Sequence, residues 1–304
     1  MDFKTRIKEF LRKLHHNKYM RGVIYAIWIL GVPIAGFYSY FIESQKPRHN
    51  RVKIKLPKEL HPDWESLRIV QISDLHFGPT NSNPAFFKKC VKEINALNAD
   101  LVVLTGDFMQ WDSSFANELA TILSQLKSKR GSYAILGNHD YGVCHPGKPA
   151  TDPVNHEEVI MAFNQNGIRV LHNESISIDH GTTNQFQFEL VGLGDFWTEH
   201  FKPHKAFNPK DAKRTHPIIL LSHNPDSLFQ LDEYDFDLML SGHVHGGQIS
   251  WPLIGPLVVP VKNRHLRRGL HRIGDKMLYA NRGLGYIFRA RLLSPPEITE
   301  IVLS

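Results

Sequence analysis

Five apolar runs in this 304-residue chain each end in a cluster of polar side chains, and this repeated pattern constrains the fold more than any other feature. The clearest pair lies between Leu101 and Tyr141, where one run leads through Gly to Asp107 and the next leads through Gly to Asn138. A short apolar run followed by glycine is typical of a buried strand that ends in a tight turn. The glycine lets the backbone turn sharply, so the next side chain lies at the carboxyl end of the strand. We therefore expect Asp107 and Asn138 to lie side by side at one edge of a sheet.

The segments between the apolar runs carry apolar side chains at helical spacing, which predicts an α/β protein. Asn83 and Pro84 mark a helix start, because asparagine caps helices and proline suits their first position. The alternation of strands and helices in the first half predicts a parallel sheet, and its recurrence suggests two sheet halves that face each other. Further helices are expected around 119–126 and 156–165, and strands at 67–72, 101–105, up to 137, 169–172, 175–178, 187–192, 217–222, 237–241, 277–280 and 297–303.

The N-terminal part contains an apolar segment that predicts a membrane anchor. Twenty residues from Gly22 to Phe41 carry no charge, which is enough to span a bilayer core as a helix. A buried core helix and a cleaved signal peptide are the alternatives, and Pro33 and Gly36 leave a shallow or re-entrant insertion open. Lys and Arg flank the segment on both sides, so the charge bias does not decide its orientation. The expected parts are a basic tail at 1–21, a transmembrane anchor at 22–43, a linker at 44–66 and a globular domain at 67–304.

The charge of the chain is concentrated in its N-terminal tail. Residues 1–21 hold seven Lys and Arg against two acidic residues, while the formal charge of the whole chain is only +6. The rest is nearly neutral, so we expect no nucleic-acid partner, and the tail suggests a neighbouring anionic surface. No protein partner is indicated. The two cysteines, Cys90 and Cys144, form no disulfide framework, and Cys90 is expected in the core on a helix face.

The polar clusters share one chemistry, because they consist of carboxylate, carboxamide and imidazole groups. These groups suit divalent ions such as Mn²⁺, Fe²⁺ and Zn²⁺. Seven of them are too many for one tetrahedral ion but suit two ions about 3.5–4 Å apart that share one carboxylate. The alternative is that Asp and Asn only serve the chemistry of tight turns. The candidate ligands are Asp74, His76, Asp107, Asn138, His223, His243 and His245.

The order of these clusters resembles the pattern D-x-H, G-D, G-N-H-D/E, H and G-H-x-H of the calcineurin-like metallophosphoesterase superfamily. The resemblance covers 67–304 and implies a four-layer αββα sandwich with two central sheets and a binuclear metal centre. It implies that Asp107 bridges two divalent ions, with Mn²⁺ as the first choice and Fe²⁺, Zn²⁺ or Ni²⁺ as alternatives. One ion would be held by Asp74, His76, Asp107 and His245, and the other by Asp107, Asn138, His223 and His243.

The reaction implied by this resemblance is hydrolysis of a phosphodiester or pyrophosphate. Two divalent ions lower the pKa of water and offset the charge that builds on a phosphoryl group. His139 follows the candidate ligand Asn138, and we assign it as the acid near the leaving oxygen. Asp140 is assigned as the group that orients His139, with simple capping of the following segment as the alternative.

A narrower resemblance points to YaeI/LpxG-type membrane-associated phosphodiesterases. It is carried by 188–197, 223–227, 242–248 and 281–285. This resemblance implies a lipid-linked phosphate substrate and a membrane as partners, with UDP-2,3-diacylglucosamine as the best single substrate, cleaved to UMP and the lipid monophosphate in lipid A biosynthesis. We then expect the chain at the bacterial inner membrane, with a single-pass or peripheral anchor and an active site on the cytoplasmic side, where a UDP-linked substrate occurs.

Two other functions remain open at this point. One is a phosphodiesterase or phosphatase that acts on a soluble substrate, and the other is a non-catalytic scaffold on the same fold, although all seven ligands and His139 are present. Trp197 belongs either to the substrate pocket or to the core. Six arginines could bind a second phosphate or a lipid surface, or form a solvated basic face: Arg264, Arg267, Arg268, Arg282, Arg289 and Arg291.

Overall fold

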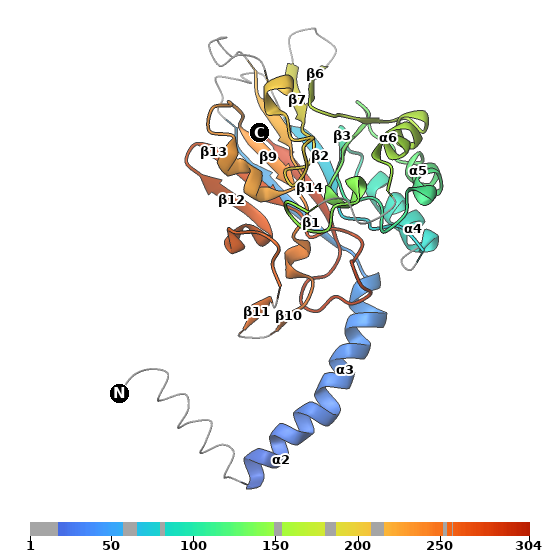
Figure 1. Cartoon of the computed structure of the whole chain (residues 1–304), viewed down its shortest axis with the longest axis vertical. Helices are drawn as coiled ribbons and strands as arrows, with labels where there is room; N and C mark the ends of the chain where they lie inside the picture. The colour runs from blue at the N-terminus through green and yellow to red at the C-terminus, as the bar shows by residue number, and fades with distance from the viewer. Residues whose placement is uncertain are drawn as a thin grey trace.

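Two six-stranded sheets pack face to face and form the body of the molecule (Figure 1). The computed structural model describes residues 18–56, 66–79, 83–148, 154–179, 187–207, 216–251, 254–256 and 258–304. In spatial order, the first sheet contains β1 (Arg48–Ile54), β14 (Glu297–Leu303), β2 (Leu67–Ile72), β3 (Leu101–Thr105), β4 (Ser132–Ile135) and β5 (Ile168–Val170). The second contains β12 (Gly269–Ile273), β13 (Lys276–Ala280), β9 (Leu238–Ser241), β8 (Ile218–Leu221), β7 (Gln187–Gly192) and β6 (Glu174–Asp179).

The strands that carry the polar clusters are parallel and buried on both faces. In the first sheet β2, β3, β4 and β5 are parallel, and in the second β7, β8 and β9 are parallel. Every residue of β3 and β8 is buried, which explains why these strands read as continuous apolar runs rather than alternating ones. Their carboxyl ends therefore meet at one edge of each sheet, as the sequence predicted.

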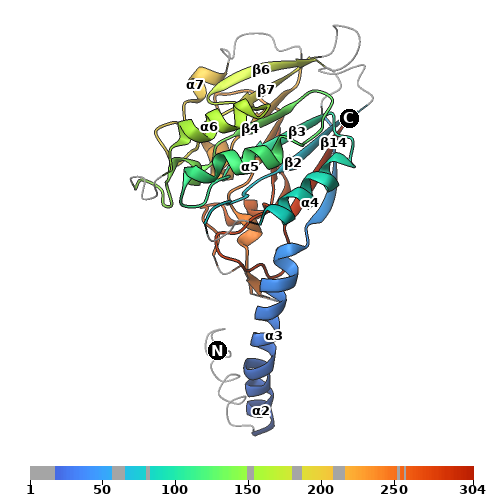
Figure 2. The ribbon, with the colours of Figure 1, turned by 90° about the vertical axis from the view of Figure 1, so that its right-hand side faces the viewer.

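Three helices cover the outer face of the first sheet (Figure 2). They are α4 (Pro84–Asn95), α5 (Ala116–Leu123) and α6 (His156–Gln165). The Asn83 side chain caps α4 by accepting the Phe86 N–H at 3.1 Å, as expected. Cys90 of α4 is 1% exposed and lies in the core, also as expected.

The layer on the outer face of the second sheet contains less helix than the predicted four-layer αββα sandwich would have. Within the described residues, the outer face of the second sheet is covered by the four-residue helix α7 (Pro203–Ala206), the 3-10 helix η7 (Pro225–Gln230) and the loops around them. Their apolar side chains, such as Ala206 and Leu228, pack on β8 and β9. The central layer between the sheets is mostly apolar and includes Leu101, Leu190 and Leu240. Buried hydrogen bonds also cross it, such as that from Nε2 of Gln71 to the carbonyl oxygen of Ser241 at 3.0 Å. The mixed α/β architecture is confirmed, with a short fourth layer.

One strand lies inside the segment that was predicted to be a linker. Residues 48–54 form β1, which pairs in parallel with β14 at the edge of the first sheet. Four of its seven residues are exposed, including Arg51 and Lys53, because charged side chains suit an edge strand that faces water. The linker prediction is therefore wrong for 48–54, while 57–65 lie outside the described residues.

A helical arm leads away from the domain at its N-terminal side (Figure 1). It consists of α2 (Lys18–Ala26), the π-helical turn η1 (Ile27–Gly31), α3 (Val32–Phe37), the π-helical turn η2 (Tyr38–Ile42) and the 3-10 turn η3 (Glu43–Gln45). The sequence predicted one transmembrane helix over 22–43. No helix in the described part of the chain has the length and apolar character needed to cross a bilayer, so that prediction is not confirmed. The basic tail lies outside the described residues up to position 17.

Candidate metal centre

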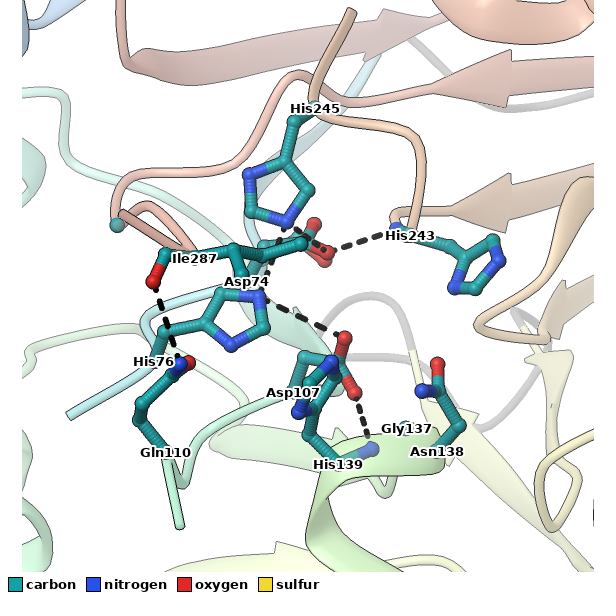
Figure 3. Close-up of polar contacts among 12 residues, drawn as sticks. Asp74, His76, Asp107, Gln110, Gly137, Asn138, His139, His243, His245 and Ile287 are labelled. Atoms are coloured by element: carbon teal, nitrogen blue, oxygen red, sulfur yellow. Dashed lines mark hydrogen bonds and ion pairs between the residues drawn. The ribbon is translucent and has the colours of Figure 1, made fainter. Parts of the chain in front are cut away.

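The seven candidate ligands and His139 converge at the carboxyl ends of strands from both sheets (Figure 3). Residues 74 and 76 follow β2, 107 follows β3, and 138 and 139 begin the 3-10 helix η6 (Asn138–Tyr141) after β4. Residue 223 follows β8, and 243 and 245 follow β9. Each of these side chains is at most 7% exposed. Groups that are separate in the sequence therefore form one buried polar site between the sheets.

Asp107 lies at the middle of this site. Its Oδ2 is 3.1 Å from Nε2 of His223 and 3.6 Å from Nε2 of His76, and its Oδ1 accepts the His139 N–H at 2.9 Å. On one side of it, Asp74, His76 and His245 place ligand atoms within 4.8 Å of one another. On the other side, Asp107 forms a second group of the same size with His223 and His243.

These groups match the division of ligands that the family resemblance implied. Asp107 belongs to the second group and lies next to the first through His76, as a shared carboxylate requires. A third group, His76, Asp107 and His139, shows that His139 also lies within reach of an ion, which the sequence did not predict. The two-ion arrangement thus has enough oxygen and nitrogen atoms, at suitable separations, within one site.

Buried atoms without hydrogen-bond partners test whether the site fits metal ions. Oδ2 of Asp74, Oδ1 of Asn138 and Nδ1 of His243 have no hydrogen-bond partner within the described residues. An unpaired buried acceptor costs about 1–3 kcal/mol, more when it is charged. Three such acceptors in one site are accounted for if each donates its lone pair to a cation, and the residues present therefore fit two divalent ions.

Backbone carbonyls set the ring orientation of two histidines. Nδ1 of His223 donates to the carbonyl oxygen of Thr105 at 2.6 Å, which directs its Nε2 toward Asp107, 3.1 Å from Oδ2. Nε2 of His243 donates to the carbonyl oxygen of Pro260 at 3.3 Å, which leaves Nδ1 for an ion. Such bonds fix the tautomer and direction of a metal-ligating imidazole.

Burial and neighbouring charges shift the pKa values of the histidines and of Asp74 in the site. Burial alone would lower the pKa of His223, but the nearby Asp107, Asp74 and Asp195 carboxylates raise it to about 10. Burial raises the pKa of Asp74 to about 7. Burial and neighbouring cationic groups lower the pKa of His76 and of His243 to about 3, so both rings are neutral at pH 7. Neutral imidazoles beside carboxylates are the form in which these side chains bind metal ions.

Backbone conformation at the site is unusual for residues with side chains. Asp74, His76, Asp107, His243 and His245 all have φ between 47° and 71°. Residues other than glycine rarely adopt this left-handed conformation, which costs about 1–3 kcal/mol each and clusters at functional sites. Five candidate ligands therefore share a strained turn geometry that directs their side chains into the centre.

Asp140 does not contact the ring of His139 as the sequence analysis proposed. Its Oδ1 accepts the N–H groups of Phe108 and Met109 at 2.8 and 2.9 Å, and its Oδ2 accepts that of Gly137 at 2.9 Å. Both oxygens of the carboxylate therefore accept hydrogen bonds from backbone N–H groups. Asp140 ties the turn after β3 to the turn after β4, which extends the capping role that was the alternative.

Two of the six arginines have environments that decide their roles. Arg291 is fully buried, donates to the carbonyl oxygens of Gly285, Arg282 and Ser294, and lies 3.3 Å from Nδ1 of His245. Arg291 therefore holds the backbone next to His245 and is not part of a solvent-exposed basic surface. Arg289 instead stacks on the ring of Tyr40 at 4.6 Å.

Three polar residues and one aromatic residue near the centre received no firm role from the sequence. Trp197 stands edge-on to His243 with ring centroids 4.4 Å apart, so it lines the site. Asp195 is fully buried, and burial raises its pKa to about 6. Gln110 and Gln248 bind the backbone of Ile287 and Phe288 beside the site. Gln248 belongs to the Gly-His-Val-His-Gly-Gly-Gln segment, which could have marked it, but no local signal marks Gln110.

Comparison with known proteins identifies a family and several relatives that are similar to this chain in sequence. The family model described as Calcineurin-like phosphoesterase matches residues 67–247. The UDP-2,3-diacylglucosamine pyrophosphatase LpxG of Chlamydia muridarum is 33% identical over 311 residues, covering 89% of this chain and 93% of that protein. Phosphodiesterase YaeI of Escherichia coli is 36% identical over 205 residues, covering 67% and 70%. A transmembrane protein with metallophosphoesterase domain from Danio rerio is 31% identical, covering 89% of this chain and 60% of that protein.

Proposed function

This chain belongs to the calcineurin-like phosphoesterase family and is a metal-dependent phosphoesterase, and we propose that it cleaves a phosphodiester or pyrophosphate bond in a lipid-linked substrate. The observation that carries the proposal is the pair of ligand groups that meet at Asp107 in a buried site at the edge of both sheets. All seven candidate ligands are present and converge there, so no observation favours a non-catalytic scaffold.

We propose that Asp74, His76, Asp107 and His245 hold one divalent ion, and that Asp107, Asn138, His223 and His243 hold the other. When bound, the two ions offset charge on the phosphoryl oxygens and lower the pKa of water. Mn²⁺ is the proposed metal, and Fe²⁺, Zn²⁺ and Ni²⁺ suit the same mixed oxygen and nitrogen ligands.

His139 is the residue proposed to hand a proton to the leaving oxygen. Its ring is 7% exposed, and its Nδ1 has no hydrogen-bond partner within the described residues. Its backbone N–H donates to Asp107, and its ring lies edge-on to that of Trp111 with centroids 6.4 Å apart. The ring centroid lies 4.8 Å from that of His76, and we propose that the imidazole protonates the leaving group rather than binding an ion.

The proposed substrate is UDP-2,3-diacylglucosamine, with UMP and the lipid monophosphate as products in lipid A biosynthesis. Similarity to LpxG over 89% of the chain supports this choice. Similarity to phosphodiesterase YaeI supports phosphodiester hydrolysis, and the second candidate function is a phosphodiesterase or phosphatase that acts on a soluble substrate. Both candidate functions hydrolyse a phosphorus–oxygen bond. They differ in whether the group attached to the phosphate is a lipid or a soluble molecule.

We further propose that the chain is attached to the bacterial inner membrane through its helical arm, with the active site on the cytoplasmic side. The name of the relative from Danio rerio and the exposed apolar side chains of the arm support membrane attachment. The proposed attachment is a single-pass or a peripheral anchor.

Product analysis tests the proposed function. The full-length protein is incubated with Mn²⁺ and UDP-2,3-diacylglucosamine in detergent, and the products are identified by mass spectrometry. We expect metal-dependent release of UMP and the lipid monophosphate, and no release with the Asp107→Ala variant. If the wild type hydrolyses a soluble aryl phosphodiester but releases nothing from the lipid substrate, the soluble-substrate function replaces the first proposal.

A further inference from the structure

Large apolar side chains are exposed on three segments that lie next to each other beside the metal centre. The loop after β13 exposes Ile287, Phe288 and Leu293 by 41%, 57% and 50%. The hairpin of β10 (Ser250–Trp251) and β11 (Gly255–Pro256) exposes Ile254 by 77%, and Val258 follows it at 72%. The domain-proximal end of the arm exposes Ile34, Phe37 and Phe41 by 55–67%. We call these eight side chains the apolar rim.

Backbone contacts hold the three segments of the rim together. Ser250 of the hairpin donates its N–H to the carbonyl oxygen of Leu292 at 2.8 Å. Glu43, at the end of the arm, is 5% exposed, and its carboxylate accepts the N–H groups of Leu293 at 3.1 Å and Ser294 at 2.8 Å. Arg291 donates its backbone N–H to the carbonyl oxygen of Ser39 at 3.2 Å. The arm therefore leaves the domain at the end that carries β10 and β11 (Figure 1).

The rim is also tied to the loops that carry the candidate ligands. Gln110, three residues after Asp107, donates to the carbonyl oxygen of Ile287 at 3.3 Å. Gln248, three residues after His245, accepts the Ile287 N–H at 3.2 Å and donates to the Phe288 carbonyl oxygen at 3.0 Å. Figure 3 shows the contact between Gln110 and Ile287 in the same view as His76 and His245. The exposed apolar side chains thus stand at the edge of the catalytic site.

The surroundings of the rim are strongly cationic. Between Glu233 and Glu297 the sequence holds only three acidic residues, Asp235, Asp237 and Asp275, of which none lies in 238–274. The same stretch carries Lys262 and, apart from the buried Arg291, the other five arginines discussed above: Arg264, Arg267, Arg268, Arg282 and Arg289. Arg264 and Arg268 donate to the carbonyl oxygens of Pro256 and Leu293, both at 3.4 Å. Arg289 rests its guanidinium over Tyr40 and Phe41, with the charge 4.6 and 6.0 Å from the ring centroids. Aromatic rings with adjacent guanidinium groups suit the boundary between acyl chains and anionic headgroups.

We propose that the apolar rim enters the interface of an anionic lipid bilayer together with the helical arm, so that the metal centre opens directly onto the headgroups. This inference rests on the proposed function, because it explains how a lipid-linked phosphate would reach a buried site. Apolar side chains can enter the acyl-chain layer of a bilayer, while the basic side chains around them contact the anionic headgroups. Exposed apolar residues far from the rim, such as Met161 on α6 and Phe229, occur singly and would stay in water.

Site-directed spin labels on the full-length chain test the position of the rim. Phe288→Cys and Ile254→Cys are labelled in a Cys144→Ser background, since Cys90 is buried, and Met161→Cys is the control with similar exposure. The probe is a vesicle of equal parts phosphatidylcholine and phosphatidylglycerol. We expect both rim labels to become protected from a water-soluble relaxation agent and accessible to oxygen, while the Met161 label does not change. Rim labels that stay in water on vesicle-bound protein overturn the proposal.

Activity separates this inference from the proposed function. The Phe288→Asp/Ile254→Asp variant is expected to hydrolyse the lipid substrate in these vesicles about tenfold more slowly than wild type, because a charge opposes insertion. Its hydrolysis of a soluble aryl phosphodiester should be unchanged, and the Met161→Asp control should match wild type on both substrates. Equal rates of the rim variant and the wild type on vesicle-borne substrate overturn the rim proposal. A wild type that inserts its rim but never cleaves the lipid overturns the proposed substrate instead.

Discussion

The Oδ1 atom of Asp74 lies 3.4 Å from Nε2 of His245, although Asp74 follows a strand of the first sheet and His245 follows a strand of the second. The same oxygen accepts the backbone N–H of His243 at 2.8 Å. The candidate metal centre therefore lies where the two sheets meet and joins them. Ions bound there would contact side chains from both sheets at once.

Mn²⁺ is expected to raise the melting temperature of the metal-free protein. A ligand that binds only the folded state at a hundredfold excess over its Kd adds about 2.7 kcal/mol to the free energy of unfolding, which corresponds to roughly 5–10 °C for a domain of this size. Calorimetry after chelator treatment measures the shift. The Asp107→Asn variant should show a much smaller one, because it weakens both sites. A shift as large as that of the wild type would contradict the shared role of Asp107.

The His139→Gln variant is expected to lose about 10²–10⁴-fold in kcat with a substrate whose leaving group is poor, because no acid protonates the leaving oxygen. The loss should be smaller with a p-nitrophenyl leaving group, which needs little protonation. His265→Gln, at an exposed position that holds no candidate ligand, is the control.

A second measurement on His139→Gln separates its two possible roles. The ring lies in one group with His76 and Asp107, so it is near enough to bind an ion. If His139 is the acid, Mn²⁺ will still raise the melting temperature of the variant as much as that of wild type. A lost shift would instead make His139 a ligand.

Gly106→Ala is expected to destabilise the protein strongly. Gly106 has φ of 87°, and a Cβ there would lie 2.6 Å from the Gly137 nitrogen and 2.7 Å from Nδ1 of His223. Gly147 has φ of 67° with no atom within 4 Å of its Cβ position, so Gly147→Ala has the backbone strain without the crowding. We expect Gly147→Ala to cost about 1 kcal/mol and Gly106→Ala at least about 3 kcal/mol in urea denaturation. Equal losses of unfolding free energy in the two variants would show that backbone strain, and not crowding around the Cβ, destabilises Gly106→Ala.

Local pattern was sufficient to predict most of the strands and the positions of the ligands. The ranges 187–192, 297–303 and 156–165 agree with β7, β14 and α6. Apolar runs identify buried parallel strands, and parallel topology then places Asp107 and Asn138 at one edge without further information. The position of clusters at one edge of a sheet therefore followed from the order of elements, whereas the joining of clusters from both sheets in one site was implied by the family resemblance.

The supporting contacts could not be predicted, because they join residues that are far apart in the chain. Glu43 binds the backbone at 293 and 294, and Arg291 lies behind His245, with no spacing rule that relates them. The strand β1 was missed since an edge strand with exposed Arg and Lys lacks the apolar alternation of an ordinary strand. Asp140 was misassigned because adjacency in sequence to His139 does not reveal which donors its carboxylate meets.

The two cysteines are expected to react at different rates with a thiol reagent. Burial raises the pKa of the Cys90 thiol to about 12, so at pH 8 it stays protonated and out of contact with solvent. Cys144 is half-buried, so part of the residue faces solvent. A colorimetric disulfide reagent should therefore modify one thiol per native chain and two in urea. In the unfolded chain Cys90 ionises near pH 8.5, so its contribution to stability is lost as pH rises from about 9 to about 12. Fast modification of both thiols in the native state would contradict the buried position of Cys90.

Glu43→Gln is expected to destabilise the junction between the arm and the domain. The Glu43 carboxylate accepts two backbone N–H groups, of Leu293 and Ser294, and is 5% exposed, so the charge-assisted bonds are shielded from water. A glutamine keeps the shape but places an NH₂ group against a backbone donor, which should cost about 1–3 kcal/mol. Urea denaturation measures the loss, and Glu118→Gln on the exposed face of α5 should be neutral. Hydrogen exchange at 293 and 294 should accelerate in the Glu43 variant, because its bonds protect those amides. If stability falls while these amides stay protected, the loss arises elsewhere and the arm is not held by this carboxylate.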